Sequence, residues 1–259
     1  MTIRKEVLAE NVVLYCGDCM HVLPEVQGVS SVLTDPPYSS GGMFRGDRAA
    51  PTGDKYQSSE YRDLYADFSG DNRDQRSFAL WASLWLGICR EKIGEGGLCG
   101  LFTDWRQLPT VTDALQVGGW VWRGIAVWDK TEAARPQKGR YRNQAEYLVW
   151  GSNGPMSDEG RCAPGVFKRS VFDGNKVHQA GKPPDLLADM LQICGPVVLD
   201  PFMGSGSTGI AAVRTGRGFV GVEISDHWFD VACKRIADEL KRPTFFAPTV
   251  APTVQDALF

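Results

Sequence analysis

The sequence VVLDPFMGSGSTG at residues 197–209 is the clearest indicator of fold class in this 259-residue chain. It begins as a short apolar run, continues through a glycine-rich turn and ends on residues that begin a helix. Gly204, Gly206 and Gly209 have the spacing G-x-G-x-x-G, which is typical of a strand–turn–helix unit that binds nucleotide-like ligands. Small residues let such a ligand approach the backbone. The stretch therefore predicts an α/β fold with a ligand site beside this turn.

An acidic residue, Glu223, closes the next apolar run at residues 219–223. Its distance along the chain from the glycines is that of an acid that accepts hydrogen bonds from ribose hydroxyls. Two classes of enzyme use this arrangement, the nicotinamide-dependent oxidoreductases and the S-adenosylmethionine-dependent methyltransferases. The glycine loop by itself leaves both open.

A second motif, Asp35-Pro36-Pro37-Tyr38, follows the apolar run at residues 29–34. Each proline fixes φ and removes a backbone N–H, so the segment is stiff and extended. At the carboxyl end of a sheet strand it would project into the ligand crevice. The Asp35 carboxylate and the Pro36 carbonyl can accept hydrogen bonds, and the Tyr38 ring can stack. These groups fit a planar molecule that carries an amino group, which a hydride-transfer site does not require.

Apolar runs and amphipathic stretches alternate along the chain, as in a mostly parallel sheet with helices on both faces. The predicted strands are residues 12–15, 29–34, 97–103, 121–128, 145–150, 197–200 and 219–223. The predicted helices are residues 76–93, 105–117, 184–194, 207–215 and 226–240. Residues 39–75 and 152–176 fit neither pattern and are interpreted as insertions. We therefore predict one domain over residues 1–240 and a flexible tail over residues 241–259.

The composition is 43% hydrophobic and 23% charged, as in an ordinary soluble domain. No apolar run is long enough to span a membrane and the first residues lack a signal-peptide pattern, so we expect a cytoplasmic protein. Cys16 and Cys19 form a C-x-x-C pair, but no second pair completes the four ligands of a zinc site. We expect no metal.

The charge pattern separates one segment from the rest of the chain. A net charge of −3 argues against a protein that binds nucleic acid non-specifically along its length, because such binding depends on neutralising phosphates. Residues 130–182, however, carry ten Lys or Arg against five Asp or Glu. This segment is a candidate polyanion-binding surface as well as an ordinary solvated one.

Together the motifs resemble those of the DNA amino-methyltransferases, which methylate the exocyclic nitrogen of adenine or cytosine, over most of residues 11–240. The segment Asp35 to Tyr38 resembles their catalytic D-P-P-Y, and Asp200 to Thr208 resembles their cofactor loop. His178 and Lys182 resemble the family's H-x-x-x-K-P element, although Ala180-Gly181 replaces the usual Thr-Gln. The catalytic motif precedes the glycine loop, and this order resembles the β group.

The resemblance implies a Rossmann-like S-adenosylmethionine-dependent methyltransferase fold with permuted motif order, and S-adenosyl-L-methionine as the cofactor. The implied catalytic residues are Asp35, Pro36, Pro37 and Tyr38. The implied cofactor-binding residues are Asp18, Cys19, His178, Lys182, Asp200, Pro201, Phe202, Gly204, Gly206, Ser207, Thr208 and Glu223.

The leading Asp of D-P-P-Y resembles adenine-N6 enzymes, so the expected reaction is methyl transfer to N6 of an adenine flipped out of double-stranded DNA. A cytosine-N4 enzyme is the first alternative. A nicotinamide-dependent oxidoreductase and a non-catalytic DNA-binding protein are the others. The β-group resemblance also implies a homodimer.

Basic residues in the insertions and the basic segment are candidate DNA contacts. They are Arg45, Arg48, Arg135, Lys138, Arg140, Arg142, Lys168, Arg169 and Lys176. Residues 39–75 are expected to form an active-site or DNA loop, and residues 152–176 a short target-recognition insertion. The end of the chain, Gln255 to Phe259, resembles the Q-x-x-L-F peptide that docks on the replication sliding clamp.

Overall fold

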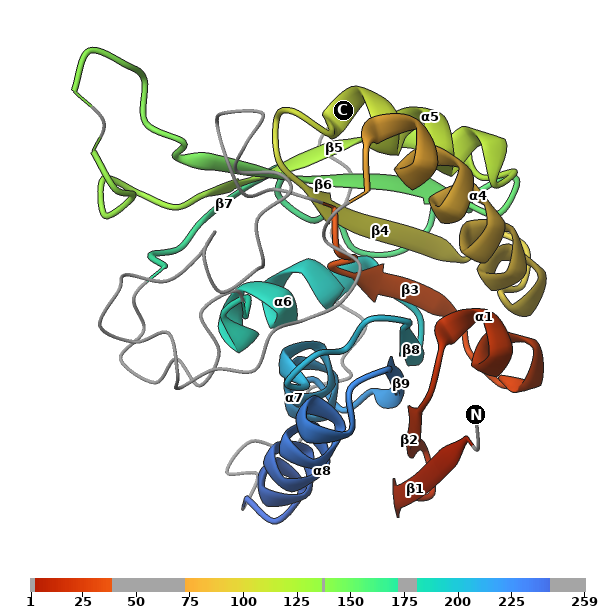
Figure 1. Ribbon diagram of the computed structural model, residues 1–259. Coiled ribbons are helices and arrows are strands. Elements are labelled where there is room, and N and C mark those ends of the chain that lie inside the picture. Colours follow the sequence, from red (N-terminus) through yellow and green to blue (C-terminus); the bar gives the residue numbers. More distant parts are fainter. Residues whose placement is uncertain (1–2, 39–72, 137, 172–180, 243–259) are drawn as a thin grey trace.

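The computed structural model describes residues 3–38, 73–136, 138–171 and 181–242. These residues form a nine-stranded sheet in the order β1-β2-β9-β8-β3-β4-β6-β5-β7 (Figure 1). The strands are β1 Arg4–Ala9, β2 Val12–Cys16, β3 Ser31–Thr34, β4 Leu98–Thr103, β5 Val121–Asp129, β6 Ala145–Ser152, β7 Val166–Lys168, β8 Val197–Asp200 and β9 Gly218–Glu223. The adjacent strands β2, β9, β8, β3 and β4 run parallel to one another. The antiparallel pairs are β1 with β2, β6 with β4 and β5 with β6.

Helices cover both faces of this sheet, as the sequence predicts (Figure 1). They are α1 Cys19–Val22, α4 Gln75–Lys92, α5 Leu108–Val117, α6 Pro184–Met190, α7 Ser207–Arg214 and α8 Asp226–Leu240, with 3₁₀ turns at Leu23–Glu25 and Leu191–Ile193. Residues of α1, α4 and α5 form one apolar cluster, and residues of α6, α7 and α8 form the other. On β3, Val32 belongs to the first cluster and Leu33 to the second, because successive side chains of a strand point to opposite faces.

Hydrogen bonds from the backbone to nearby carboxylates determine where α4 and α5 begin. The Asp74 carboxylate accepts hydrogen bonds from the backbone N–H groups of Arg76 and Ser77, which begins α4. The predicted helix at residues 105–117 begins only at Leu108, because the Asp104 carboxylate binds the backbone N–H groups of Arg106 and Gln107 in a turn. No described helix is both long and apolar enough to cross a membrane.

Three elements were not predicted from sequence: β1, β7 and the short α1. The prediction that residues 152–176 are irregular is wrong at Val166–Lys168, which pairs in parallel with β5. Phe167 explains this pairing, since its side chain is buried in the same apolar cluster as Trp128 of β5. The predicted insertion at residues 39–75 lies almost wholly outside the described residues, as does the tail beyond residue 242.

The sheet has a switch point between β3 and β8. From β3 the chain continues to β4 on one side, and from β8 it continues to β9 on the other. The two strand ends are tied together because the Thr34 hydroxyl donates a 2.7 Å hydrogen bond to Asp200 Oδ1. Ligands of open α/β sheets bind at the carboxyl ends of strands that diverge in this way.

Candidate active site

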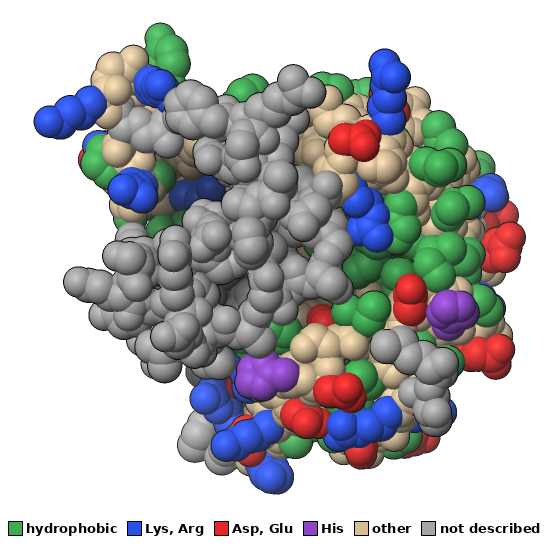
Figure 2. All heavy atoms as spheres, in the orientation of Figure 1, with side chains coloured by type: hydrophobic (Ala, Val, Ile, Leu, Met, Phe, Trp, Pro, Cys, Tyr) green, Lys and Arg blue, Asp and Glu red, His purple; other side chains and the backbone are tan. Residues whose placement is uncertain are grey.

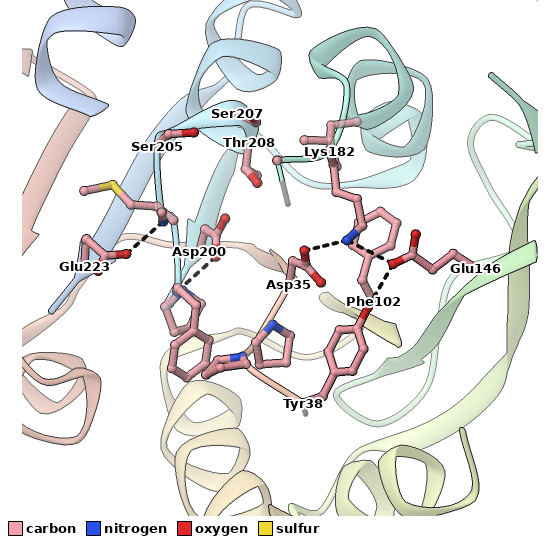
Figure 3. A pocket seen from close by; sticks show the side chains of 18 of the residues that line it. Asp35, Tyr38, Phe102, Glu146, Lys182, Asp200, Ser205, Ser207, Thr208 and Glu223 are labelled. Carbon is pink, nitrogen blue, oxygen red and sulfur yellow. Dashed lines mark hydrogen bonds and ion pairs between the residues drawn. The ribbon is translucent and has the colours of Figure 1, made fainter. Parts of the chain in front are cut away.

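A cavity of about 530 Å³ lies at this switch point (Figure 3). The glycine loop after β8 lines one part of it, and the Asp35 segment after β3 lines another. The predicted residues that line it are Asp18, Cys19, Asp35, Pro36, Pro37, Tyr38, Lys182, Asp200, Pro201, Phe202, Gly204, Ser207, Thr208 and Glu223. Tertiary structure thus brings two motifs that are far apart in the chain to one cavity.

The glycine loop presents its backbone to the cavity at Gly204. Gly204 has φ +51°, and a Cβ placed there would meet no atom within 4 Å. Its N–H donates a 3.0 Å hydrogen bond to Glu223 Oε2, and the Ser225 N–H donates one of 2.8 Å to Oε1. Burial raises the pKa of Glu223, and these two hydrogen bonds partly oppose that shift. Glu223 therefore fixes the loop while its carboxylate remains on the cavity wall.

Gly206 has another role. Its φ is +84°, and a Cβ there would lie 3.1 Å from the side chains of Ala232 and Ile236 on α8. Gly206 is also not among the residues that line the cavity. The second glycine of the motif therefore lets the loop pack on α8, whereas the first faces the ligand space.

Asp200 is a buried structural acid at the end of β8, with 2% of its surface exposed. Burial raises its pKa to about 6, although hydrogen bonds from Thr34, Thr208 and the Phe202 N–H oppose the shift. The Phe202 ring that follows packs 5.2 Å from Trp81 and 5.1 Å from Trp85, centroid to centroid. Phe202 and Trp81 form an apolar wall of the cavity beside the glycine loop, and Trp85 packs behind Phe202.

Asp18 and Cys19 lie at the start of α1, where the Asp18 carboxylate accepts a 2.9 Å hydrogen bond from the Met20 N–H. Burial raises the pKa of the Cys19 thiol to about 12, so this thiol stays protonated at neutral pH. The Cys16 thiol donates to Asp226 Oδ1 at 3.4 Å. Within the described ranges, no group of three or more potential metal ligands occurs.

The Asp35 segment contacts two groups that come from other parts of the chain (Figure 3). Lys182 Nζ lies 2.5 Å from Asp35 Oδ2 and 3.1 Å from Glu146 Oε1. The Tyr38 hydroxyl donates a 2.8 Å hydrogen bond to the same Glu146 oxygen. Lys182 is predicted from sequence to bind the cofactor; it lines the cavity, and its ammonium group contacts Asp35.

Sequence reasoning missed Glu146. It lies on β6, and only 12% of its side chain is exposed. The signal was present, because this acid interrupts the apolar run AEYLVWG and a buried carboxylate requires partners. What could not be foreseen was that its partners would be Tyr38 and Lys182.

Those candidate DNA contacts that lie among the described residues do not line the cavity. Arg135, Lys138, Arg140 and Arg142 are exposed on the connection between β5 and β6, which projects from the molecule and carries Lys and Arg side chains at the upper left of Figure 2. Arg142 donates to the Glu132 carbonyl, and exposed Arg169 pairs with Asp189 at 2.8 Å. Lys168 is exposed on β7. Arg45, Arg48, Lys176, His178 and the terminal peptide Gln255 to Phe259 lie outside the described residues.

Comparison with known proteins accounts for this arrangement. The sequence profile of the N6/N4 DNA methylase family matches residues 29–161 and 157–234, which is most of the chain. The chain belongs to the N6/N4 DNA methylase family. Among relatives of this DNA methylase, YubD of Escherichia coli (strain K12), a protein named as a methylase, is 28% identical over 85% of this chain and 88% of its own. The type II methyltransferase M.HinfI of Haemophilus influenzae is 24% identical over 88% of this chain and 68% of its own.

Solved structures resemble this DNA methylase in fold. The complex of M1.HpyAVI with S-adenosylmethionine has a TM-score of 0.62 and 20% identity, over 86% of this chain and 98% of that one. The cytosine-N4-specific PvuII DNA methyltransferase has a TM-score of 0.63 and 17% identity, over 93% and 89%. The predicted methyltransferase fold is confirmed, and a cofactor-bound neighbour supports the predicted cofactor. Because the chain belongs to this family, it is a DNA methyltransferase. The alternatives of an oxidoreductase and of a non-catalytic DNA-binding protein are therefore excluded.

Proposed function

We propose that this DNA methyltransferase transfers a methyl group from S-adenosyl-L-methionine to N6 of an adenine in double-stranded DNA. One observation carries the proposal: the Asp35 segment and the glycine loop line the same cavity, at the ends of the adjacent strands β3 and β8. A methyl donor held by the loop and an amino group held by Asp35 would therefore share one cavity.

The cavity fits the cofactor. The open space over Gly204 allows a ligand to approach the backbone, and the Glu223 carboxylate on the wall can accept hydrogen bonds from ribose hydroxyls. Asp18 and the aromatic wall at Phe202 are the remaining contacts we assign to it. When bound, S-adenosyl-L-methionine supplies an electrophilic methyl group on its sulfonium.

The chain's own residues orient the nucleophile. Asp35 and the Pro36 carbonyl would accept hydrogen bonds from the two amino hydrogens, and this favours the tetrahedral form of the nitrogen as it reacts. The Tyr38 ring would stack on the flipped base and replace its lost neighbours. Fixing the two reacting atoms in one cavity can supply much of the rate enhancement.

Cytosine-N4 methylation is the second candidate. It is favoured by the TM-score of 0.63 to the PvuII DNA methyltransferase, which is cytosine-N4-specific. Adenine remains our choice because the motif begins with Asp35 rather than Ser. Nucleoside analysis of DNA methylated by the purified protein separates the two, since only one modified nucleoside will accumulate.

DNA would bind through the exposed basic residues between β5 and β6, with Lys168 and Arg169 beside them. We also propose a cytoplasmic homodimer with a single catalytic domain over residues 1–240, and docking of Gln255 to Phe259 on a sliding clamp. Sequencing of DNA modified by the protein would report the recognition site and the modified base together.

Asp35→Asn tests the catalytic assignment, because it removes the charge and keeps the shape of the side chain. We expect methylation to fall by about a hundredfold or more, while calorimetric binding of S-adenosyl-L-methionine is retained. Asp113→Asn, at an exposed carboxylate on α5 outside the cavity, is the control and should keep full activity. Methylation by Asp35→Asn at the wild-type rate would reject the role of Asp35.

A further inference from the structure

Glu146 belongs to none of the motifs that suggested the function, yet side chains from three other parts of the chain contact its carboxylate. Its Oε1 accepts a hydrogen bond from the Tyr38 hydroxyl at 2.8 Å and lies 3.1 Å from Lys182 Nζ. Its Oε2 lies 3.5 Å from Lys130 Nζ. Three donors therefore converge on one largely buried carboxylate.

Lys182 extends this network to the catalytic acid. Its side chain is 8% exposed, and its Nζ lies between Asp35 Oδ2 and Glu146 Oε1 and 5.0 Å from the centre of the Phe102 ring. Tyr38 is held at a second point, because Gln107 Nε2 donates a 3.0 Å hydrogen bond to its carbonyl. The Tyr38 side chain thus contacts Glu146 directly, and the Asp35 carboxylate is linked to Glu146 through Lys182 (Figure 3).

We infer that Glu146 is a positioning residue for methyl transfer, which holds the Tyr38 ring directly and the Asp35 carboxylate through Lys182. The inference rests on the proposed function. Glu146 would touch neither the cofactor nor the target base, and would act by fixing the two groups that hold the base.

Charge balance explains why an acid is needed at this position. Two ammonium groups, Lys130 and Lys182, face two carboxylates, Glu146 and Asp35. Removal of one partner from a buried ion pair leaves the other charge without compensation. Without the Glu146 charge, Lys182 would depend on Asp35 alone, and the orientation of the Asp35 carboxylate would change with it.

The same contacts give the network a pH dependence. Burial alone would lower the pKa of Lys182, but Asp35 and Glu146 raise it above its ordinary value. Burial opposes ionisation of Glu146, whereas Lys182 and Lys130 lower its pKa. The ionisable groups that face the network are Asp35 and Tyr38 after β3, Asp104 after β4, Lys130 after β5, Glu146 on β6 and Asp200 on β8. Neutralising Glu146 would therefore make Lys182 lose its proton at lower pH.

Two variants separate the contributions of Glu146. Glu146→Gln removes its charge but keeps an oxygen that can accept from the Tyr38 hydroxyl. Tyr38→Phe removes that hydroxyl and keeps every charge. Single-turnover methylation of a DNA duplex across pH, calorimetric affinity for S-adenosyl-L-methionine and thermal unfolding are measured for both.

We expect Glu146→Gln to lower the single-turnover rate about 10- to 100-fold, with cofactor affinity within twofold of wild type. The alkaline limit of its activity should move to lower pH, which a merely structural role would not produce. Tyr38→Phe should lower the rate with no shift of that limit. The double variant should lose less than the two single losses combined, because both changes act on one network.

A wild-type rate and pH profile in Glu146→Gln would overturn the inference, and so would an equal loss of cofactor affinity and rate. If Glu146→Gln does not fold, Tyr38→Phe still tests the ring, and its full activity would overturn the direct contact. Failure of the proposed function has another signature, since wild-type protein would then methylate no DNA.

Discussion

Alanine at Gly204 and at Gly206 should have different consequences, although both glycines belong to the same sequence motif. Both have positive φ, +51° and +84°. At Gly204 the added Cβ meets open space, whereas at Gly206 it lies 3.1 Å from Ala232 Cβ and Ile236 Cδ1. The first variant therefore probes the ligand space and the second probes the packing of the loop on α8.

The magnitudes follow from these contacts. A left-handed backbone costs a residue with a Cβ about 1–2 kcal/mol, and this is the whole expected loss of unfolding free energy for Gly204→Ala. Crowding against the buried side chains of α8 adds about 1–3 kcal/mol, so Gly206→Ala should lose about 2–5 kcal/mol. For a domain of this size each kcal/mol lowers Tm by about 2–4 °C.

Unfolding followed with and without S-adenosyl-L-methionine separates the two effects. At a cofactor concentration one hundred times its Kd, wild type should gain about 2.7 kcal/mol of stability. In Gly204→Ala the new methyl group occupies ligand space, and a tenfold weaker affinity would reduce this gain to about 1.4 kcal/mol. Gly206→Ala should start from a lower Tm and keep more of the gain.

Two results would refute this account. One is a Gly204→Ala variant that gains as much stability from the cofactor as wild type does. The other is a Gly206→Ala variant that is as stable as Gly204→Ala in the absence of cofactor. Either result would mean that the two glycines do not face the environments described above.

Three further measurements test other parts of the site. Glu223→Gln should weaken cofactor binding about 10- to 100-fold by calorimetry, because a charged hydrogen-bond acceptor for ribose is lost and the Gly204 N–H loses a strong partner. Asp200 has a pKa raised from 3.8 to about 6, so the folded state binds its proton more tightly than the unfolded state does. Its contribution to the unfolding free energy should therefore fall by about 3 kcal/mol as pH rises from about 4 to about 6, and the difference between wild type and Asp200→Asn across pH measures this. Replacing Arg135 and Lys138 with Ala should reduce the slope of log K for DNA against log salt by about 0.9 for each lost phosphate contact, with cofactor affinity unchanged.

The sequence predicted correctly those helices and strands that have a clear pattern within their own residues. Residues 197–200 form β8 and residues 226–240 form α8, both with the predicted bounds. These elements have apolar periodicity bounded by residues that cap or turn the chain. The short strand β7 gave no such signal, because three residues show no period and their strand conformation depends on pairing with β5.

From sequence alone came the motifs, their order, the type of fold and the chemistry that an acid, two prolines and a tyrosine can perform. These follow from backbone stiffness, hydrogen-bonding capacity and spacing, which are properties of neighbouring residues. Tertiary structure decided which distant groups meet: it placed Lys182 between Asp35 and Glu146, and it separated the roles of Gly204 and Gly206. Contacts of this kind depend on strand order and on packing between faces, and no local pattern in the chain encodes them.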